Sequence, residues 1–272
     1  IPQFIFISAT VRNDTANNLV AALCLLFMLW IMGQPACLSW QKACALGVFL
    51  GSAVLTKATA AFLIPVTIQA VWSSPWPLSG RIRVLCIAGS ASLLLVGAYV
   101  LAFPEARVAF HYSVTHAQVK PAHLSIPYLL SIPAPLLNMF WATFGWANVA
   151  VPPMWIRLAN GVGLIGILTT VVYCVVRRVR AKAATLQIKQ IALLLVAIGC
   201  NILLVVRYNL YEYQPQGRFL FPSLLPLALL ALWGPWHIMP SSLRAPAAAF
   251  LIGCMLLFST LSLYLYVIPA YY

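Results

Sequence analysis

Residues 213–222, with the sequence YQPQGRFLFP, combine a fixed positive charge with amide side chains at the start of an apolar run. The guanidinium of Arg218 can bind a phosphate or carboxylate through two parallel hydrogen bonds. Gln216 and the nearby Glu212 add polar groups, and Gly217 allows the backbone to approach a ligand closely. The segment therefore predicts an anion-binding site at the end of a membrane span. Alternatively, Glu212 and Arg218 simply pair with one another.

Four further polar residues lie between apolar segments. Arg12, Asn13 and Asp14 are consecutive, and Lys57 separates two apolar segments with almost no linker. Asp14 could cap a helix and pair with Arg12, or its carboxylate could orient a sugar or a divalent cation while Arg12 contacts a phosphate. Lys57 either extends to the membrane surface or supplies a compact charge for a lipid phosphate.

An aromatic stretch at residues 140–146 contains Trp141 and Trp146. Such a stretch is typical of the membrane–water interface. The alternative is an aromatic wall that binds a sugar ring or an isoprenoid tail.

Three of the four histidines lie five and seven residues apart, a spacing that does not put two ligands on one helix face. We expect no metal site from them and infer no cofactor, although a divalent cation near Asp14 stays open. Each histidine could act as an acid or base near neutral pH. They are His111, His116 and His123.

The composition is that of a membrane protein. Of the 272 residues, 63% are hydrophobic and 7% are charged, whereas soluble domains have about 25% charged residues. The net charge of +13 does not indicate nucleic-acid binding, because most of the cations flank apolar runs and therefore report topology. The seven cysteines form no C-x-x-C pair, so neither a zinc site nor a disulfide framework is predicted.

The apolar runs predict an all-α, polytopic transmembrane bundle that forms one domain over residues 1–272. A run at 1–9 is about half of the roughly 20 residues that a span needs, so we expect a fragment of a longer protein. An outer loop at 104–156, rich in proline, would carry a re-entrant or interfacial helix at 129–144. Eight full spans are expected, at residues 16–32, 43–56, 58–72, 84–103, 157–176, 191–206, 219–232 and 246–267.

Successive loops between the expected spans lie on alternating sides of the membrane, and this assignment separates the charges. One side has nine cations and no acid, which predicts the cytoplasmic face of a multi-pass protein in a bacterial inner membrane. The other, outer side has all three acids together with Lys57 and Arg218. The nine inner cations are Lys42, Arg81, Arg83, Arg177, Arg178, Arg180, Lys182, Lys189 and Arg244.

Several motifs together resemble the GT-C superfamily of polytopic membrane glycosyltransferases, which includes protein O-mannosyltransferases and the aminoarabinose transferase of lipid A. In that superfamily an Asp follows the third span and a Leu-Thr-Lys sequence closes the fifth. Here Asp14 ends the similar stretch at residues 8–14, and Lys57 ends the similar stretch at residues 47–57. Similar short motifs, indicating a less characterised bacterial branch, lie at 140–146, 216–222 and 268–272.

The resemblance implies transfer of a sugar from a polyprenyl-phosphate donor to a glycan, lipid or protein acceptor of the cell envelope, on the outer face. Asp14 would be a supporting carboxylate, and Lys57 and Arg218 would hold the donor phosphate. The main catalytic base of the family lies in an earlier outer loop, which we expect before residue 1. The alternatives are a transporter or lipid flippase, and a membrane subunit without catalysis.

Overall fold

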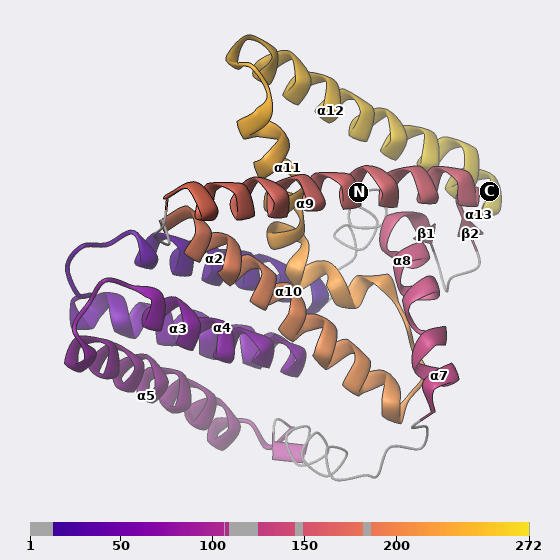
Figure 1. The fold of residues 1–272 in the computed structure, drawn as a ribbon. Helices are drawn as coiled ribbons and strands as arrows, with labels where there is room; N and C mark the ends of the chain where they lie inside the picture. The colour runs from indigo at the N-terminus through magenta and orange to yellow at the C-terminus, as the bar shows by residue number, and fades with distance from the viewer. Residues whose placement is uncertain (1–12, 106, 109–124, 145–148, 182–185, 272) are drawn as a thin grey trace.

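The computed structural model describes residues 13–105, 107–108, 125–144, 149–181 and 186–271, and nearly all of these are helical (Figure 1). The N-terminal half contains α2 (Asn13–Met32), α3 (Trp40–Thr56), the 3-10 helix η1 (Ala58–Phe62), α4 (Leu63–Ser73) and α5 (Leu78–Ala102). The C-terminal half contains α7 (Ile126–Ser131), α8 (Pro133–Ala142), β1 (Thr143–Phe144), β2 (Val149–Ala150), α9 (Pro153–Ala181), α10 (Leu186–Tyr211), the 3-10 helix η2 (Gly217–Ser223), α11 (Leu224–Ile238), α12 (Ser241–Ser262), the π-helical η3 (Leu263–Val267) and α13 (Ile268–Tyr271).

Six helices are long and apolar enough to cross a membrane, which makes this an integral, multi-pass membrane protein. They correspond to six of the eight expected spans. The other two expected spans coincide with α3, which has 17 residues, and with the shorter apolar helix Ala58–Ser73. The count of eight therefore stays a prediction. The six are Asp14–Met32, Leu78–Ala102, Pro153–Arg177, Leu186–Tyr211, Gly217–Ile238 and Ser241–Ala270.

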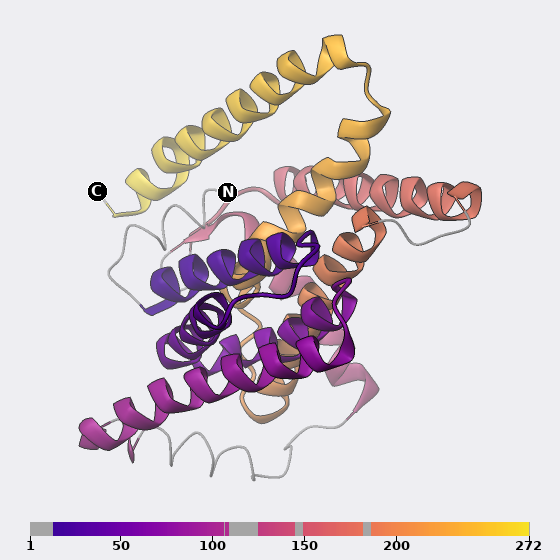
Figure 2. The ribbon, with the colours of Figure 1, turned by 90° about the vertical axis from the view of Figure 1, so that its left-hand side faces the viewer.

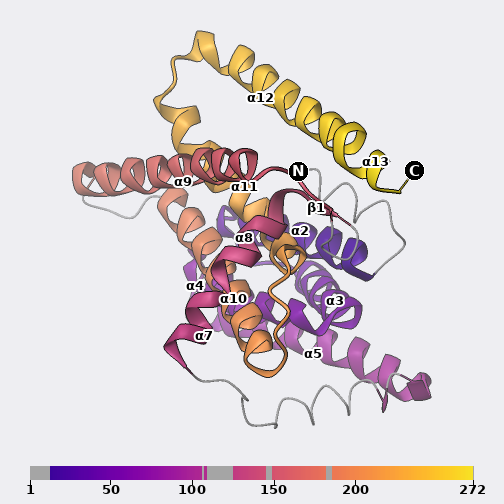
Figure 3. The same cartoon turned by 90° about the vertical axis from the view of Figure 1, so that its right-hand side faces the viewer.

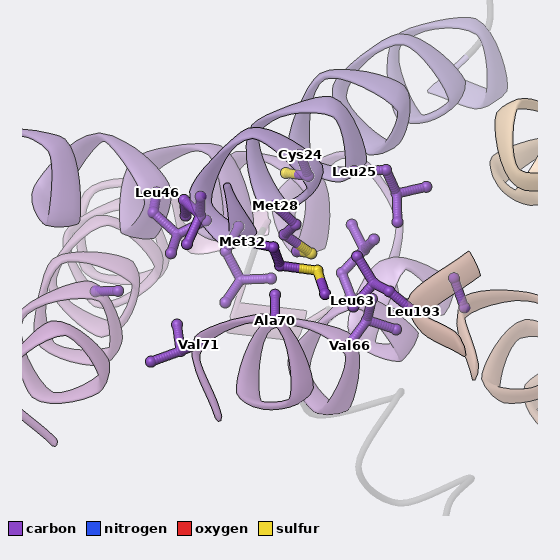
Figure 4. Packing of buried hydrophobic residues seen from close by; sticks show 14 of the residues in the cluster. Cys24, Leu25, Met28, Met32, Leu46, Leu63, Val66, Ala70, Val71 and Leu193 are labelled. Atoms are coloured by element: carbon purple, nitrogen blue, oxygen red, sulfur yellow. The ribbon is translucent and has the colours of Figure 1, made fainter. Parts of the chain in front are cut away.

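The main apolar core joins α2, α3, α4 and α5 with one side of α10. Met28 and Met32 of α2 lie close to Leu63, Val66 and Ala70 of α4 (Figure 4). The buried α2 positions recur every three to four residues, which is the spacing of one helix face. Helices α3 and α4, on either side of Lys57, both pack against α2.

Small residues allow two helix pairs to pack with their backbones close together. A Cβ atom added at Gly47 of α3 would lie 2.2 Å from the carbonyl oxygen of Ala88 in α5. In the pair α9–α11, the hydroxyl of Thr170 donates to the Leu230 carbonyl at 2.5 Å and accepts from the Gly234 N–H at 2.6 Å. Small residues and interhelical hydrogen bonds of this kind stabilise helix pairs in lipid.

Helix α12 lies apart from the bundle, and α5 lies on the opposite side (Figures 1 to 3). Most side chains of α12 are exposed, and its contacts lie mainly with η3, which follows it. An apolar helix with this exposure needs lipid or another apolar surface around it.

Residues 129–144, expected to form one re-entrant or interfacial helix, form two short helices instead. Ser125 caps α7 by accepting a hydrogen bond from the Tyr128 N–H at 3.3 Å, and α8 starts at Pro133, where proline suits the first helical turn. A small antiparallel sheet follows, pairing Thr143 with Ala150 and Phe144 with Val149. Their position relative to a membrane stays a prediction.

Replacing Gly47 with Ala should lower the stability of the protein, because the new methyl group collides with the α5 backbone. Overpacking of this kind costs about 1–3 kcal/mol, and thermal unfolding in detergent would measure it. Gly97→Ala in α5 is the matched control, since a Cβ atom there meets nothing within 4 Å. Equal melting temperatures for the two variants would contradict the close packing of α3 on α5.

Candidate functional site

Three of the residues singled out in the sequence meet at one end of the bundle. Asp14 lies in the first turn of α2, Lys57 lies between α3 and η1, and Arg218 lies in η2. The three come from segments more than 40 residues apart in the sequence. Alternation of the spans predicts one side of the membrane for all three, and the structure brings them together as ion pairs.

The Asp14 carboxylate lies between the two cations. The Lys57 ammonium donates a hydrogen bond to Oδ1, and Nη1 of Arg218 lies 3.8 Å from Oδ2. The second distance is that of an ion pair without a direct hydrogen bond. The Asp14 side chain is 9% exposed, against 20% for Lys57 and 25% for Arg218. Two positive charges and one negative charge leave the cluster with a net charge of about +1.

The ring of Phe219 contacts both cations. The Lys57 ammonium lies 4.9 Å from the ring centroid, and the Arg218 guanidinium carbon lies 5.5 Å from it. The negative face of an aromatic ring stabilises a cation at such distances. Tyr208 of α10 packs edge-on against the same ring at 5.4 Å. The ring therefore holds both cations on one side of η2.

Local backbone structure explains the position of each charge. Lys57 interrupts the helix with an extended conformation, φ −162° and ψ 128°, while its N–H still donates to the Ala53 carbonyl. Its own carbonyl accepts from the Ala60 N–H and starts η1. Asp14 lies at the N-terminal end of α2, where unpaired backbone N–H groups favour a negative charge. It lies inside the helix rather than before it.

Gly217 provides the close backbone contact expected of it, but with a protein neighbour. A Cβ atom at this position would lie 2.2 Å from the backbone nitrogen of Phe140 in α8. The expected approach to a ligand is therefore replaced by an approach of η2 to α8. This contact therefore fixes the backbone position of the next residue, Arg218.

Buried asparagines lie near the ion cluster, and the sequence analysis did not identify them as site residues. Asn17 and Asn18 follow Asp14 by one turn of α2, and Asn201 of α10 donates to the Phe219 carbonyl at 3.2 Å and to Ser223 Oγ at 2.9 Å. Asparagine inside an apolar span was the signal that could have found them. Among the described residues, four buried polar atoms in this region have no hydrogen-bond partner: Asn17 Oδ1, Asn18 Nδ2, Asn201 Oδ1 and Arg218 Nε.

Glu212 does not form the expected alternative pair with Arg218. Its carboxylate accepts hydrogen bonds from Tyr208 at 3.0 Å and from the Gln214 side chain at 2.5 Å. It is exposed, at the loop between α10 and η2. Gln216 is half-buried just before η2, and its carbonyl accepts from the Phe219 N–H at 3.1 Å.

Of the two tryptophans predicted for the site, Trp141 lies behind η2, and Trp146 lies outside the described residues. Trp141 donates from its ring nitrogen to Asn160 of α9 at 2.7 Å and packs against the apolar cluster behind η2. It supports the site from behind and has no contact with the charges among the described side chains. Trp146, Arg12 and the three histidines lie outside the described residues, as does the side chain of Asn13.

The chemistry of the cluster favours an anion over a metal ion. Asp14 is already paired with two cations, so its oxygens are poor ligands for a divalent cation. Among the described residues no group of three or more His, Cys, Asp or Glu side chains could hold a metal. The net positive charge and the unpaired Nε of Arg218 could bind a phosphate oxygen.

Removing the Asp14 charge should destabilise the fold, because two partly buried cations then repel each other. We expect Asp14→Asn to cost about 1–3 kcal/mol, less than a fully buried pair would, and adding Lys57→Gln should restore part of it. A double-mutant cycle on unfolding in detergent measures this coupling. Glu212→Gln is the control and should change stability by less than about 0.5 kcal/mol, because that carboxylate is exposed. Additive effects of the two substitutions would contradict a structural ion pair.

Gly217→Ala should force η2 away from α8 and lower stability by about 1–3 kcal/mol. The control is Gly163→Ala in α9, where the nearest atom is a ring carbon of Trp141 at 4.0 Å. Melting temperatures would compare the two. If the Gly217 variant melts with the control, the contact with α8 does not determine the position of η2.

The chain matches no known protein-family model, no characterised protein and no solved structure. The resemblance to the GT-C superfamily therefore stays a prediction that depends on short motifs.

Proposed function

We propose that this protein is a membrane glycosyltransferase, or a part of one, that transfers a sugar from a polyprenyl-phosphate donor to a cell-envelope acceptor on the outer face of a bacterial inner membrane. One observation carries the proposal. Lys57 and Arg218 together exceed the charge of Asp14 by one, at the ends of apolar helices and beside buried polar atoms that have no partner among the described residues.

A lipid-linked phosphate fits this position for reasons of charge and depth. The cluster lies at the start of two helical segments that are long enough to span a membrane, Asp14–Met32 and Gly217–Ile238. A ligand bound there would keep its phosphate at the membrane surface and its isoprenoid chain among apolar side chains. The free amide atoms of Asn17, Asn18 and Asn201 could bind hydroxyl groups of the attached sugar.

The proposed reaction is an inverting displacement. An acceptor hydroxyl attacks the anomeric carbon, the bond from that carbon to the phosphate oxygen breaks, and the polyprenyl phosphate leaves with the bonding electrons. Lys57 and Arg218 would stabilise the charge that develops on the phosphate. Asp14 would hold the two cations in place. The group that accepts the hydroxyl proton would lie elsewhere, because Asp14 is already engaged by both cations.

A lipid-phosphate transporter is the second candidate, and the helix breaks favour it. The chain is extended at Lys57 between α3 and η1, and η2 is a 3-10 segment before α11. Discontinuous helices often form transporter substrate sites. Such a protein would bind the same phosphate and move it across the membrane without breaking a sugar–phosphate bond.

Replacing Arg218 or Lys57 with Gln should reduce sugar transfer by about 100-fold, the effect of removing one donor that stabilises transition-state charge. The measurement is the sugar composition of the cell envelope in a deletion strain that carries each variant. Arg107→Gln is the matched control, because Arg107 is exposed and bonds only to the backbone carbonyls of Val100 and Leu101 among the described residues.

The outcomes separate the three functions. Loss of one sugar with Arg218→Gln, and its retention with Arg107→Gln, supports the transferase. An unchanged envelope in the deletion strain itself would overturn it and indicate a subunit without catalysis. Accumulation of the intact lipid-linked sugar on the inner face would indicate the transporter.

A further inference from the structure

Four cations gather at the end of the bundle opposite Asp14. They are Lys42, Arg81, Arg83 and Lys189, which we call the basic collar. Helix α2 runs from the ion cluster to this end over 20 residues, a length of about 30 Å. The collar residues lie near the N-terminal ends of α3, α5 and α10, and these ends are on the left in Figure 1.

Hydrogen bonds between loops assemble the collar. The ring nitrogen of Trp76 donates to the Gln34 carbonyl at 3.0 Å, which joins the α2–α3 loop to the α4–α5 loop. Lys189 of α10 donates to the Ser73 carbonyl at 3.1 Å, and Arg81 donates to the Ser74 carbonyl at 2.9 Å. These contacts are independent of the ion cluster.

The charges of the collar are not neutralised within the protein. The chain has three acids in total, and all are described: Asp14 and Glu212 lie at the opposite end, and Glu105 follows the far end of α5. The partners of the collar are backbone carbonyls, aromatic rings and a thiol. A cation bound to such neutral groups keeps its attraction for an external anion.

Tryptophan rings indicate the depth of the collar. Lys42 lies 5.0 Å from the centre of the Trp30 ring, and Arg81 lies 5.8 Å from that of Trp72. The two tryptophans are 40% and 54% exposed. Tryptophan and basic residues together at the ends of membrane helices are typical of the lipid headgroup region.

Arg83 lines a hollow of about 240 Å³ together with Cys37, Pro77, Ser79 and Gly80. Its guanidinium is exposed and donates a weak hydrogen bond to the Cys37 sulfur at 3.5 Å. The guanidinium therefore remains available for a phosphate, which it can bind through two hydrogen bonds. The Ser79 hydroxyl could add a third.

An apolar surface leads away from the hollow. Leu78 and Ile82, beside Arg83 on α5, are 56% and 49% exposed, and Leu93 and Leu94 farther along the same helix are 74% and 72% exposed. A ligand bound at Arg83 would thus have anionic and apolar parts side by side. A soluble acidic protein or a nucleic acid would not cover the exposed apolar surface of α5, whereas a lipid would.

We propose that the basic collar binds anionic glycerophospholipids, with the headgroup phosphate in the Arg83 hollow and an acyl chain along α5. This site is separate from the ion cluster and does not depend on the proposed glycosyltransferase activity. Each cation near an anionic surface adds about fivefold to binding. The collar would hold this end of the protein against an anionic leaflet.

The test is a titration of the purified protein in neutral detergent with short-chain phosphatidylglycerol, followed by native mass spectrometry. Arg83→Gln should weaken binding about fivefold or more, and Arg83→Lys should weaken it less, because it keeps the charge but loses the planar fork. Arg244→Gln is the matched control: it removes the same charge from a cation that bonds to Met239 and lies over Trp236, outside the collar.

Each outcome decides something. A loss with Arg83→Gln and affinity within about twofold of wild type with Arg244→Gln would support the site. Equal losses in both variants would mean diffuse attraction and would overturn it. Equal binding of soluble glycerol phosphate would overturn the acyl-chain contact, and stronger competition by polyglutamate would indicate an acidic protein partner instead. If Arg83→Gln does not fold, the Arg83→Lys variant and the two soluble competitors still decide the question.

Discussion

The ion cluster of Asp14, Lys57 and Arg218 is the interaction on which the arrangement of three separate segments depends. Its carboxylate joins the start of α2, the break after α3 and the 3-10 segment η2, which lie far apart in the sequence. In an apolar environment an unpaired charge is costly, so each member keeps the others in place. The helix break at Lys57 is tolerated because its backbone groups still bond to Ala53 and Ala60. The same three charges that fix the segments also leave the net positive charge on which the proposed function depends.

The two ends of the bundle differ in whether a carboxylate balances the cations. At the site end, the Asp14 carboxylate pairs with both cations, and four buried polar atoms still have no partner in the described part of the chain. At the collar end, carbonyls, rings and a sulfur atom contact the cations without neutralising them. A small anionic group in a partly buried site suits the first arrangement, and an extended anionic surface suits the second. The proposed sugar transfer and the proposed lipid contact therefore lie at different ends of the bundle. The first depends on a partly buried ion cluster, and the second depends on cations that no carboxylate balances.

Backbone approach sets how closely the elements can pack around both ends. Gly47 brings α3 against α5, and Gly217 brings η2 against α8. Because the second contact lies one residue before Arg218, helix packing and the position of a charged side chain are coupled there. Thr170 does the same for α9 and α11 through two hydrogen bonds. Tight contacts of small residues replace the hydrophobic effect, which does not drive one helix against another in lipid.

The sequence by itself determined the class of protein, the approximate positions of the six long apolar helices, and the separation of acids from the basic loops, because hydropathy and loop charge are local properties of the chain. It also singled out Asp14, Lys57 and Arg218, since ionisable residues at span ends are few. Only the tertiary structure decided that these three touch, that Glu212 bonds to Tyr208 instead of Arg218, and that Trp141 lies behind the site. It also decided that Gly217 meets α8 and that Asn17, Asn18 and Asn201 have amide atoms without a hydrogen-bond partner in the described part of the chain. Each of these depends on the rotation of one helix against another, which follows from packing between distant segments and leaves no local pattern in the sequence.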